Sequence, residues 1–138
     1  MKPLSKILYL EDDPHISEIA LIALRDIAGF DEHHCGKGQD AINSFTEFQP
    51  DMLLLDVMLP DLDGPQVLEA IRKLDGGKSV PAIFMTAKAQ KHEQDAYMQQ
   101  GAISVIVKPF DALTLGETLQ SLWSSRGSQS AGEAHLVS

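Results

Sequence analysis

Short uninterrupted apolar runs alternate with longer segments of helical periodicity along this chain. A run without polar alternation is typical of a strand that is buried on both faces of a parallel sheet. The clearest runs lie at residues 7–10, 52–55, 82–85 and 105–107. A weaker run at residues 32–35 lies at the spacing where a further strand is expected. The pattern therefore predicts five strands.

The segments between these runs predict helices. Apolar side chains recur at helical spacing in residues 16–27, 41–48, 67–74 and 115–123. In the first of these, one face carries Ile16, Ile19, Ala20, Ala23, Leu24 and Ile27. The fifth predicted helix, at residues 92–100, is mostly polar. Strand and helix thus alternate five times, which predicts a three-layer, doubly wound α/β domain with helices on both faces of a parallel sheet.

Length, charge and cysteine content limit the classes of function. A chain of 138 residues suggests one domain, and no apolar run approaches the ~20 residues of a membrane span. The net charge of −9 argues against direct binding to nucleic acid or to an anionic membrane. The single cysteine, Cys35, excludes an internal disulfide, and the N-terminus has no signal-peptide pattern. We therefore expect a cytoplasmic protein.

The end of the chain differs from the rest in composition. The last 15 residues contain five Ser and two Gly and show no periodicity. This composition is typical of a flexible segment. We expect one domain at residues 4–124, followed by a flexible tail or linker stub at residues 125–138.

Polar residues stand directly at the ends of the predicted strands. They are Glu11, Asp12, Asp13, Asp56, Thr86 and Lys108. Taken singly, each has an ordinary role as a strand end or a helix cap, and Asp13 before Pro14 is the clearest case. As a set they are harder to explain, because ligands of open α/β sheets bind outside the carboxyl ends of the strands.

If the three carboxylates of Glu11, Asp12 and Asp56 meet at one edge of the sheet, a positive charge is needed to offset their repulsion. Two carboxylates 4 Å apart repel by ~1 kcal/mol in water and by ~4 kcal/mol at an effective dielectric of 20. Mg²⁺ is commonly held through a few carboxylates with part of its water shell retained. A metal ion, a lysine and a hydroxyl around one carboxylate suit a phosphoryl group.

These residues resemble the receiver domain of bacterial two-component response regulators, from about Lys6 to Trp123. The resemblance rests on five separated elements: Glu11-Asp12-Asp13, Asp56, Pro60 with Gly64, Thr86-Ala87, and Lys108-Pro109-Phe110. It implies a flavodoxin-like fold of five βα units with strand order 2-1-3-4-5.

The resemblance also implies roles for single residues. Asp56 is the expected phosphoacceptor, and Thr86 and Lys108 are expected to bind the phosphoryl oxygens. The implied ligands of Mg²⁺, or of Mn²⁺ in its place, are Glu11, Asp12, Asp56 and the backbone carbonyl of Met58. The resemblance further implies that the small Ala87 leaves access to the acceptor open, and that the peptide bond between Lys108 and Pro109 is cis.

Four positions bear on switching and on the lifetime of the phosphoryl group. Receiver domains usually carry an aromatic residue where this chain has Val105, and Tyr97 is a candidate to replace its packing. The resemblance also implies that Met58 and Lys88 flank the route of the attacking water. Because an apolar Met58 cannot orient water, we expect slow self-dephosphorylation.

The predicted function is that of a phosphoacceptor signalling domain, which is not an enzyme acting on a separate substrate. Its implied partners are a sensor histidine kinase or phosphotransfer protein, a downstream protein target or an output domain absent from these 138 residues, and a second copy bound through the fourth helix, fifth strand and fifth helix. The main alternative is a pseudo-receiver, a phosphorylation-independent interaction module. An aspartyl-phosphate hydrolase is disfavoured, because Asp56-Val57-Met58 lacks the second Asp that such enzymes carry.

Overall fold

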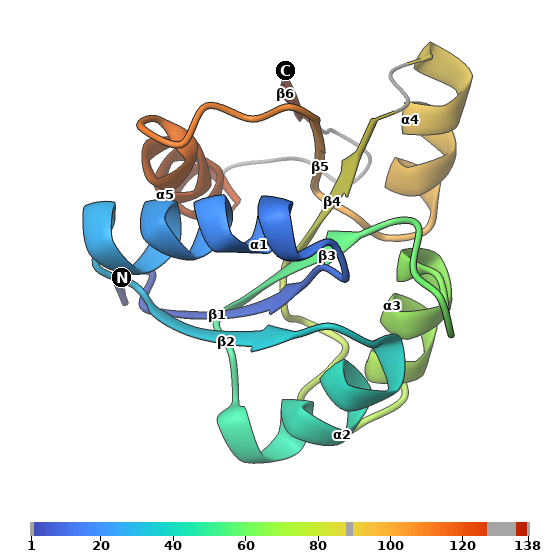
Figure 1. Ribbon diagram of the computed structural model, residues 1–138. Helices are drawn as coiled ribbons and strands as arrows, with labels where there is room; N and C mark the ends of the chain where they lie inside the picture. The colour runs from blue at the N-terminus through green and yellow to red at the C-terminus, as the bar shows by residue number, and fades with distance from the viewer. Residues whose placement is uncertain (1, 88–89, 127–134, 138) are drawn as a thin grey trace.

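The computed structural model describes residues 2–87, 90–126 and 135–137 (Figure 1). Its strands are β1 Lys6–Leu10, β2 Asp31–Cys35, β3 Met52–Asp56, β4 Ala82–Thr86, β5 Ser104–Val107 and β6 His135–Val137. Its helices are α1 Pro14–Leu21, the π-helical η1 Ile22–Ile27, α2 Gly38–Phe48, α3 Gly64–Arg72, α4 Lys91–Gln99 and α5 Leu115–Ser125. None of the helices in this described part of the chain has the length and apolar character needed to cross a membrane.

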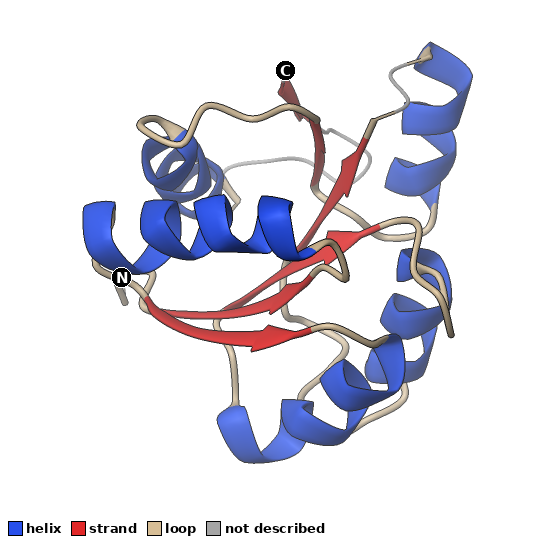
Figure 2. Ribbon diagram, in the orientation of Figure 1, coloured by secondary structure: helices blue, strands red, loops and turns tan. Residues whose placement is uncertain are grey.

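The first five strands form a parallel sheet in the order β2-β1-β3-β4-β5. Helices α1 and α5 pack on one face, and α2, α3 and α4 pack on the other (Figures 1 and 2). Strands β3 and β4 are buried along their whole length, as uninterrupted apolar runs require. The predicted three-layer, doubly wound α/β fold with strand order 2-1-3-4-5 is therefore confirmed.

A sixth strand lies at the edge of this sheet, in a segment whose composition predicted only a flexible tail. Strand β6 pairs in parallel with β5, from Ser104 opposite His135 to Ile106 opposite Val137. Without it, β5 would be an edge strand with unpaired N–H and C=O groups, which readily accept a further strand. A three-residue strand is too short to show periodicity, so its sequence carries no signal. The proposed domain boundary at residue 124 stays a prediction.

The first predicted helix is divided into α1 and η1, and its apolar face is only partly covered. Ala20, Ala23 and Leu24 are fully buried against the sheet. By contrast, Ile19 and Ile27 have 51% and 49% of their surface exposed. The apolar face predicted from helical spacing is therefore wider than the face that the sheet and α5 cover.

Candidate functional site

Four strands deliver polar side chains to their carboxyl ends. Glu11 directly follows β1, Asp56 ends β3, Thr86 ends β4, and Lys108 directly follows β5. Because these strands are parallel, the four positions meet at the same edge of the sheet (Figure 1). Glu11, Asp56 and Thr86 are buried, whereas Asp12 is exposed.

The acidic side chains form one cluster around a single lysine. Oxygen atoms of Glu11, Asp12 and Asp56 all lie within 4.8 Å of one another. The ammonium of Lys108 lies 2.7 Å from Glu11 Oε1 and 2.9 Å from Asp56 Oδ1. Three carboxylates and one ammonium leave this cluster two charges short of neutrality when all are ionised. An all-oxygen donor set with excess negative charge is suited to a hard divalent cation.

The pKa values of Asp56 and Lys108 reflect this crowding. Burial raises the pKa of Asp56 to about 6, with the hydrogen bond from Lys108 opposing the rise and the charge of Glu11 adding to it. Burial alone would lower the pKa of Lys108, but its hydrogen bonds to Glu11 and Asp56 outweigh burial and raise it. Lys108 therefore stays cationic at neutral pH, beside a carboxylate whose ionised form is destabilised.

Neighbouring strands hold Glu11 in position. Its backbone N–H donates to the carbonyl of Cys35 at 3.0 Å, and its own carbonyl lies 2.8 Å from His34 Nε2. Its Oε2 accepts from the backbone N–H of Asp13 at 3.2 Å, and Asp13 in turn caps α1. The role of His34 had no signal in the sequence, because it arises only from the pairing of β1 with β2.

The loop after β3 is fixed by close backbone packing. The N–H of Gly64 donates to the carbonyl of Val57 at 2.8 Å, and a Cβ at Gly64 would lie 2.5 Å from the carbonyl oxygen of Asp56. Asp61 accepts hydrogen bonds from the N–H groups of Gln39 and Gly38, which lower its pKa to about 2. The same loop carries Met58, whose side chain is 68% exposed.

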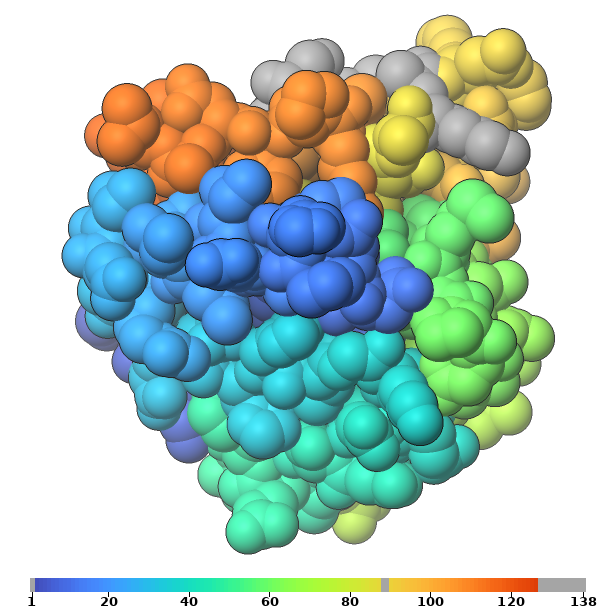
Figure 3. Space-filling model, in the orientation of Figure 1, coloured from blue at the N-terminus to red at the C-terminus, as the bar shows by residue number. Residues whose placement is uncertain are grey.

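A mainly apolar cavity of about 300 Å³ opens beside Lys108. It lies between α1 and the segment that follows β5, which are side by side in Figure 3. Its lining residues are Ile16, Ile19, Ala87, Lys108, Pro109 and Phe110. The Lys108–Pro109 peptide bond is cis. Ala87 is exposed at this opening, so a small side chain borders the approach to the site.

Two predicted residues lie apart from the cluster. Val105 is fully buried in β5, opposite Phe84 of β4, and does not reach the carboxylates through any described contact. Lys88 lies outside the described residues. The structure therefore brings together Glu11, Asp12, Asp56, Thr86 and Lys108 at the sheet edge, with Met58 and Ala87 in the adjoining loops.

Comparisons with known proteins agree with this geometry. The response regulator receiver domain family matches residues 7–120. DNA-binding response regulator MtrA of Mycolicibacterium smegmatis is 36% identical over 105 residues, which cover 76% of this chain and 44% of that protein. Transcriptional regulatory protein TrcR of Mycobacterium tuberculosis is 33% identical over 117 residues, covering 85% of this chain and 44% of that protein. The structure of Vibrio cholerae chemotaxis protein CheY4 has 26% sequence identity and a TM-score of 0.80, over 86% of this chain and 98% of that one.

The chain spans less than half the length of MtrA and TrcR, so it corresponds to one part of those longer proteins. It spans nearly the whole of CheY4. The family match covers all five elements on which the resemblance rests, from the acids after β1 to the lysine and proline after β5. The chain therefore belongs to the response regulator receiver domain family of two-component systems.

Proposed function

We propose that this chain accepts a phosphoryl group on Asp56 from a phosphohistidine of a sensor histidine kinase or phosphotransfer protein. One observation carries the proposal: the buried Asp56 carboxylate shares a single ammonium with a second buried carboxylate and lies within 4.8 Å of a third. A structural ion pair needs only one acid for one base. The surplus of negative charge is what a divalent cation would balance.

In the proposed transfer, an oxygen of Asp56 forms a bond to phosphorus as the phosphorus–nitrogen bond of the phosphohistidine breaks. The electron pair of that bond leaves with the imidazole nitrogen, which takes a proton from solvent. Lys108, already 2.9 Å from Asp56 Oδ1, would pair with one phosphoryl oxygen, and the Thr86 hydroxyl would donate to another. Because charge spreads over the phosphoryl oxygens, positioning and electrostatics supply most of the catalysis.

The oxygen-only donor set fits Mg²⁺, or Mn²⁺ in its place. Glu11, Asp12, Asp56 and the backbone carbonyl of Met58 would hold the ion. When bound, the ion supplies positive charge to the phosphoryl oxygens. Asp12 is the exposed member of this set, so the site is open to solvent on that side.

We further propose that phosphorylation changes contacts with a downstream protein or with an output domain elsewhere in the same protein. The face formed by α4, β5 and α5 is the proposed surface, including for a homodimer, and a partner that binds β5 would have to contact or displace β6, which pairs with it. The net charge of −9 disfavours direct contact of this domain with nucleic acid. A cytoplasmic location remains the expectation for a domain with this proposed kinase partner.

One observation favours the alternative of a pseudo-receiver that acts without phosphorylation. Val105 stands where family members usually carry an aromatic switch residue, which leaves the signalling step altered even if the chemistry is retained. The two functions differ in whether Asp56 is modified.

The test is incubation with Mg²⁺ and a small acyl phosphate, followed by measurement of the intact mass. We expect one phosphoryl group on the wild type and on the control Asp26→Asn, which changes an exposed acid of η1. We expect none on Asp56→Asn. A wild-type protein that gains no mass at high acyl phosphate and Mg²⁺ would support the pseudo-receiver instead.

A further inference from the structure

The buried position in β5 opposite Phe84 carries a valine. In the parallel register, Val105 lies directly across from Phe84, so both side chains point to the face covered by α3 and α4. Val105 is fully buried, β-branched and without a polar atom. It therefore cannot form a hydrogen bond with the hydroxyl at the end of β4.

An aromatic hydroxyl reaches the same place from α4. The ring of Tyr97 packs edge-on against Phe84, with ring centroids 5.4 Å apart and an interplanar angle of 65°. The Thr86 side chain is a hydrogen-bond partner of the Tyr97 phenol. Burial raises the pKa of Tyr97, the charge of Glu93 adds to this rise, and the hydrogen bond with Thr86 opposes it. Tyr97 thus joins α4 both to the core of the sheet and to the candidate site.

The Thr86 side chain, which bonds Tyr97, points away from Asp56. Phe84 belongs to the apolar cluster on the α3 and α4 side, and Met85 belongs to the cluster on the opposite side. Because side chains alternate along β4, Thr86 faces the same side of the sheet as Phe84. Asp56 directly follows Leu55, which faces that same side, so Asp56 faces the opposite side. To donate to a phosphoryl oxygen on Asp56, the Thr86 hydroxyl must turn away from Tyr97.

Helix α4 buries fewer of its side chains than any other helix in the described part of the chain. Gln94 is its one buried residue, and Tyr97 is half-buried and packs against the apolar cluster on this face of the sheet. Beyond its C-terminus, Arg72 of α3 donates to the carbonyl of Gly101 at 3.3 Å. The apolar packing at the centre of α4 therefore depends on Tyr97.

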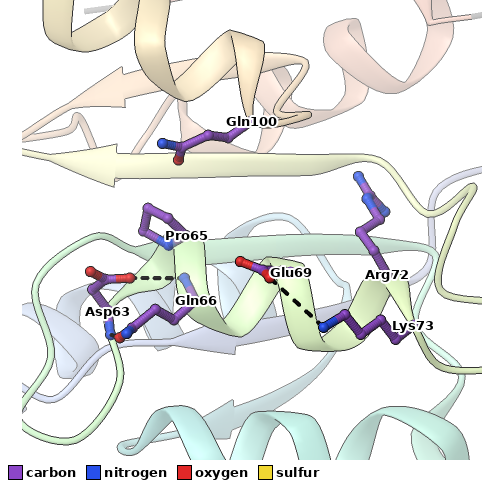
Figure 4. Close-up of a pocket in the computed structure, with 7 residues that line it drawn as sticks. All are labelled: Asp63, Pro65, Gln66, Glu69, Arg72, Lys73 and Gln100. Carbon is purple, nitrogen blue, oxygen red and sulfur yellow. Dashed lines mark hydrogen bonds and ion pairs between the residues drawn. The ribbon is translucent and has the colours of Figure 1, made fainter.

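A cavity of about 510 Å³ lies between α3 and the C-terminal end of α4 (Figure 4). It is lined by Asp63, Pro65, Gln66, Glu69, Arg72, Lys73 and Gln100. In Figure 4, Gln100 stands across the cavity from Pro65 and Glu69. The C-terminal end of α4 is therefore not packed tightly against α3.

We propose that Tyr97 is a positioning residue that couples the phosphorylation state of Asp56 to helix α4 through the Thr86 hydroxyl. The inference rests on the proposed function, since it takes a phosphoryl group on Asp56 as the trigger. In the unmodified protein the Tyr97–Thr86 hydrogen bond holds the centre of α4 against β4. When Thr86 turns to the phosphoryl group, this bond is lost and α4 is released.

The test is amide hydrogen exchange of α4, measured by mass spectrometry before and after phosphorylation with Mg²⁺ and an acyl phosphate. In the wild type we expect phosphorylation to speed exchange in α4 about fivefold, the factor that corresponds to about 1 kcal/mol for one hydrogen bond. Tyr97→Phe keeps the ring on Phe84 but removes the hydroxyl. In this variant α4 should exchange at the faster rate in both states. Intact mass verifies that it still takes up one phosphoryl group.

The matched control is Tyr9→Phe, which removes the other tyrosine hydroxyl of the chain. That hydroxyl is buried and has no hydrogen-bond partner among the described residues, so the control should keep the fivefold response. In the unmodified protein, Thr86→Val should speed exchange in α4 as much as Tyr97→Phe does. Exchange in the double variant should be no faster than in either single variant, because both changes remove the same hydrogen bond.

The outcomes separate two failures. A phosphorylated Tyr97→Phe protein whose α4 responds as the wild type does would overturn this inference alone, and so would additive effects in the double variant. A wild-type chain that takes up no phosphoryl group would overturn the proposed function and this inference together.

Discussion

Replacing the candidate phosphoacceptor with a neutral residue should stabilise the unmodified protein. In Asp56→Asn the side chain keeps its shape, but the charge that Glu11 and Asp12 repel is removed. Because the three acids lie within 4.8 Å of one another, each carboxylate pair repels by about 3 kcal/mol at an effective dielectric of 20. Lys108, 2.9 Å from Asp56, offsets only part of this repulsion.

The pKa of Asp56 gives the net magnitude. Its value of about 6, against 3.8 for the free side chain, corresponds to about 3 kcal/mol that the ionised form costs the folded state. Since the folded protein binds this proton more tightly than the unfolded chain does, the free energy of unfolding falls as pH rises between about 4 and 6. Asp56→Asn does not lose stability in this way, because its amide side chain does not ionise. We therefore expect the free energy of unfolding of Asp56→Asn to exceed that of the wild type by about 2–3 kcal/mol at pH 7. At pH 4 the two values should differ little.

The assay is urea unfolding of both proteins across this pH range, without divalent ions. The exposed Asp26→Asn serves as the control and should follow the wild type at every pH. Added Mg²⁺ should narrow the difference at pH 7, because binding stabilises the folded wild type. A variant that is no more stable than the wild type at pH 7, or a difference that does not vary with pH, would refute the electrostatic reasoning.

Three further predictions concern a glycine packed on the site, an acid at the opposite edge of the sheet and the lifetime of the phosphoryl group. Gly64→Ala should lower the free energy of unfolding by about 1–3 kcal/mol in urea titrations, because its Cβ would lie 2.5 Å from the carbonyl oxygen of Asp56; unchanged stability would contradict the close approach. Asp51→Ala should lower the free energy of unfolding by about 2–3 kcal/mol at pH 7. The Asp51 carboxylate accepts hydrogen bonds from two backbone amides at 2.9 and 3.0 Å and pairs with Lys2 at 2.8 Å. Burial would raise the pKa of Asp51, but these bonds hold it below 3.8, so the contribution should disappear as pH falls through that lowered value. The phosphorylated protein should lose its phosphoryl group over minutes or longer in a mass time course, and Met58→Asn should shorten that time; a wild-type half-life of seconds would contradict the role given to Met58.

Much of the fold could be predicted from the sequence because four of its strands are mostly buried. The runs that became β1, β3, β4 and β5 are continuous and apolar, and their order along the chain leaves few topologies once crossovers are right-handed. Strand β2 reads as Asp-Glu-His-His-Cys and was predicted from spacing alone, since it lies between β1 and solvent. Strand β6 was not predicted, because three residues carry no period and the strand forms only against the edge of β5.

The members of the site could be proposed from the sequence, but not all of the contacts that hold them. The positions of Glu11, Asp56 and Lys108 follow from the rule that parallel strands end at one edge. The contact of His34 with Glu11 and that of Tyr97 with Thr86 depend on which way side chains point across separate elements. Periodicity specifies the face on which a residue lies, and it does not specify the atom that a side chain on that face will meet.

Site-specific chemistry can show whether Asp56 itself carries the phosphoryl group. The protein is incubated with Mg²⁺ and a small acyl phosphate, and then with borohydride, which reduces an aspartyl phosphate to homoserine and leaves a free carboxylate unchanged. Peptide mapping then identifies the converted residue. We expect homoserine at position 56 alone, dependent on both Mg²⁺ and the acyl phosphate. Conversion at another acid, or at none, would contradict this expectation.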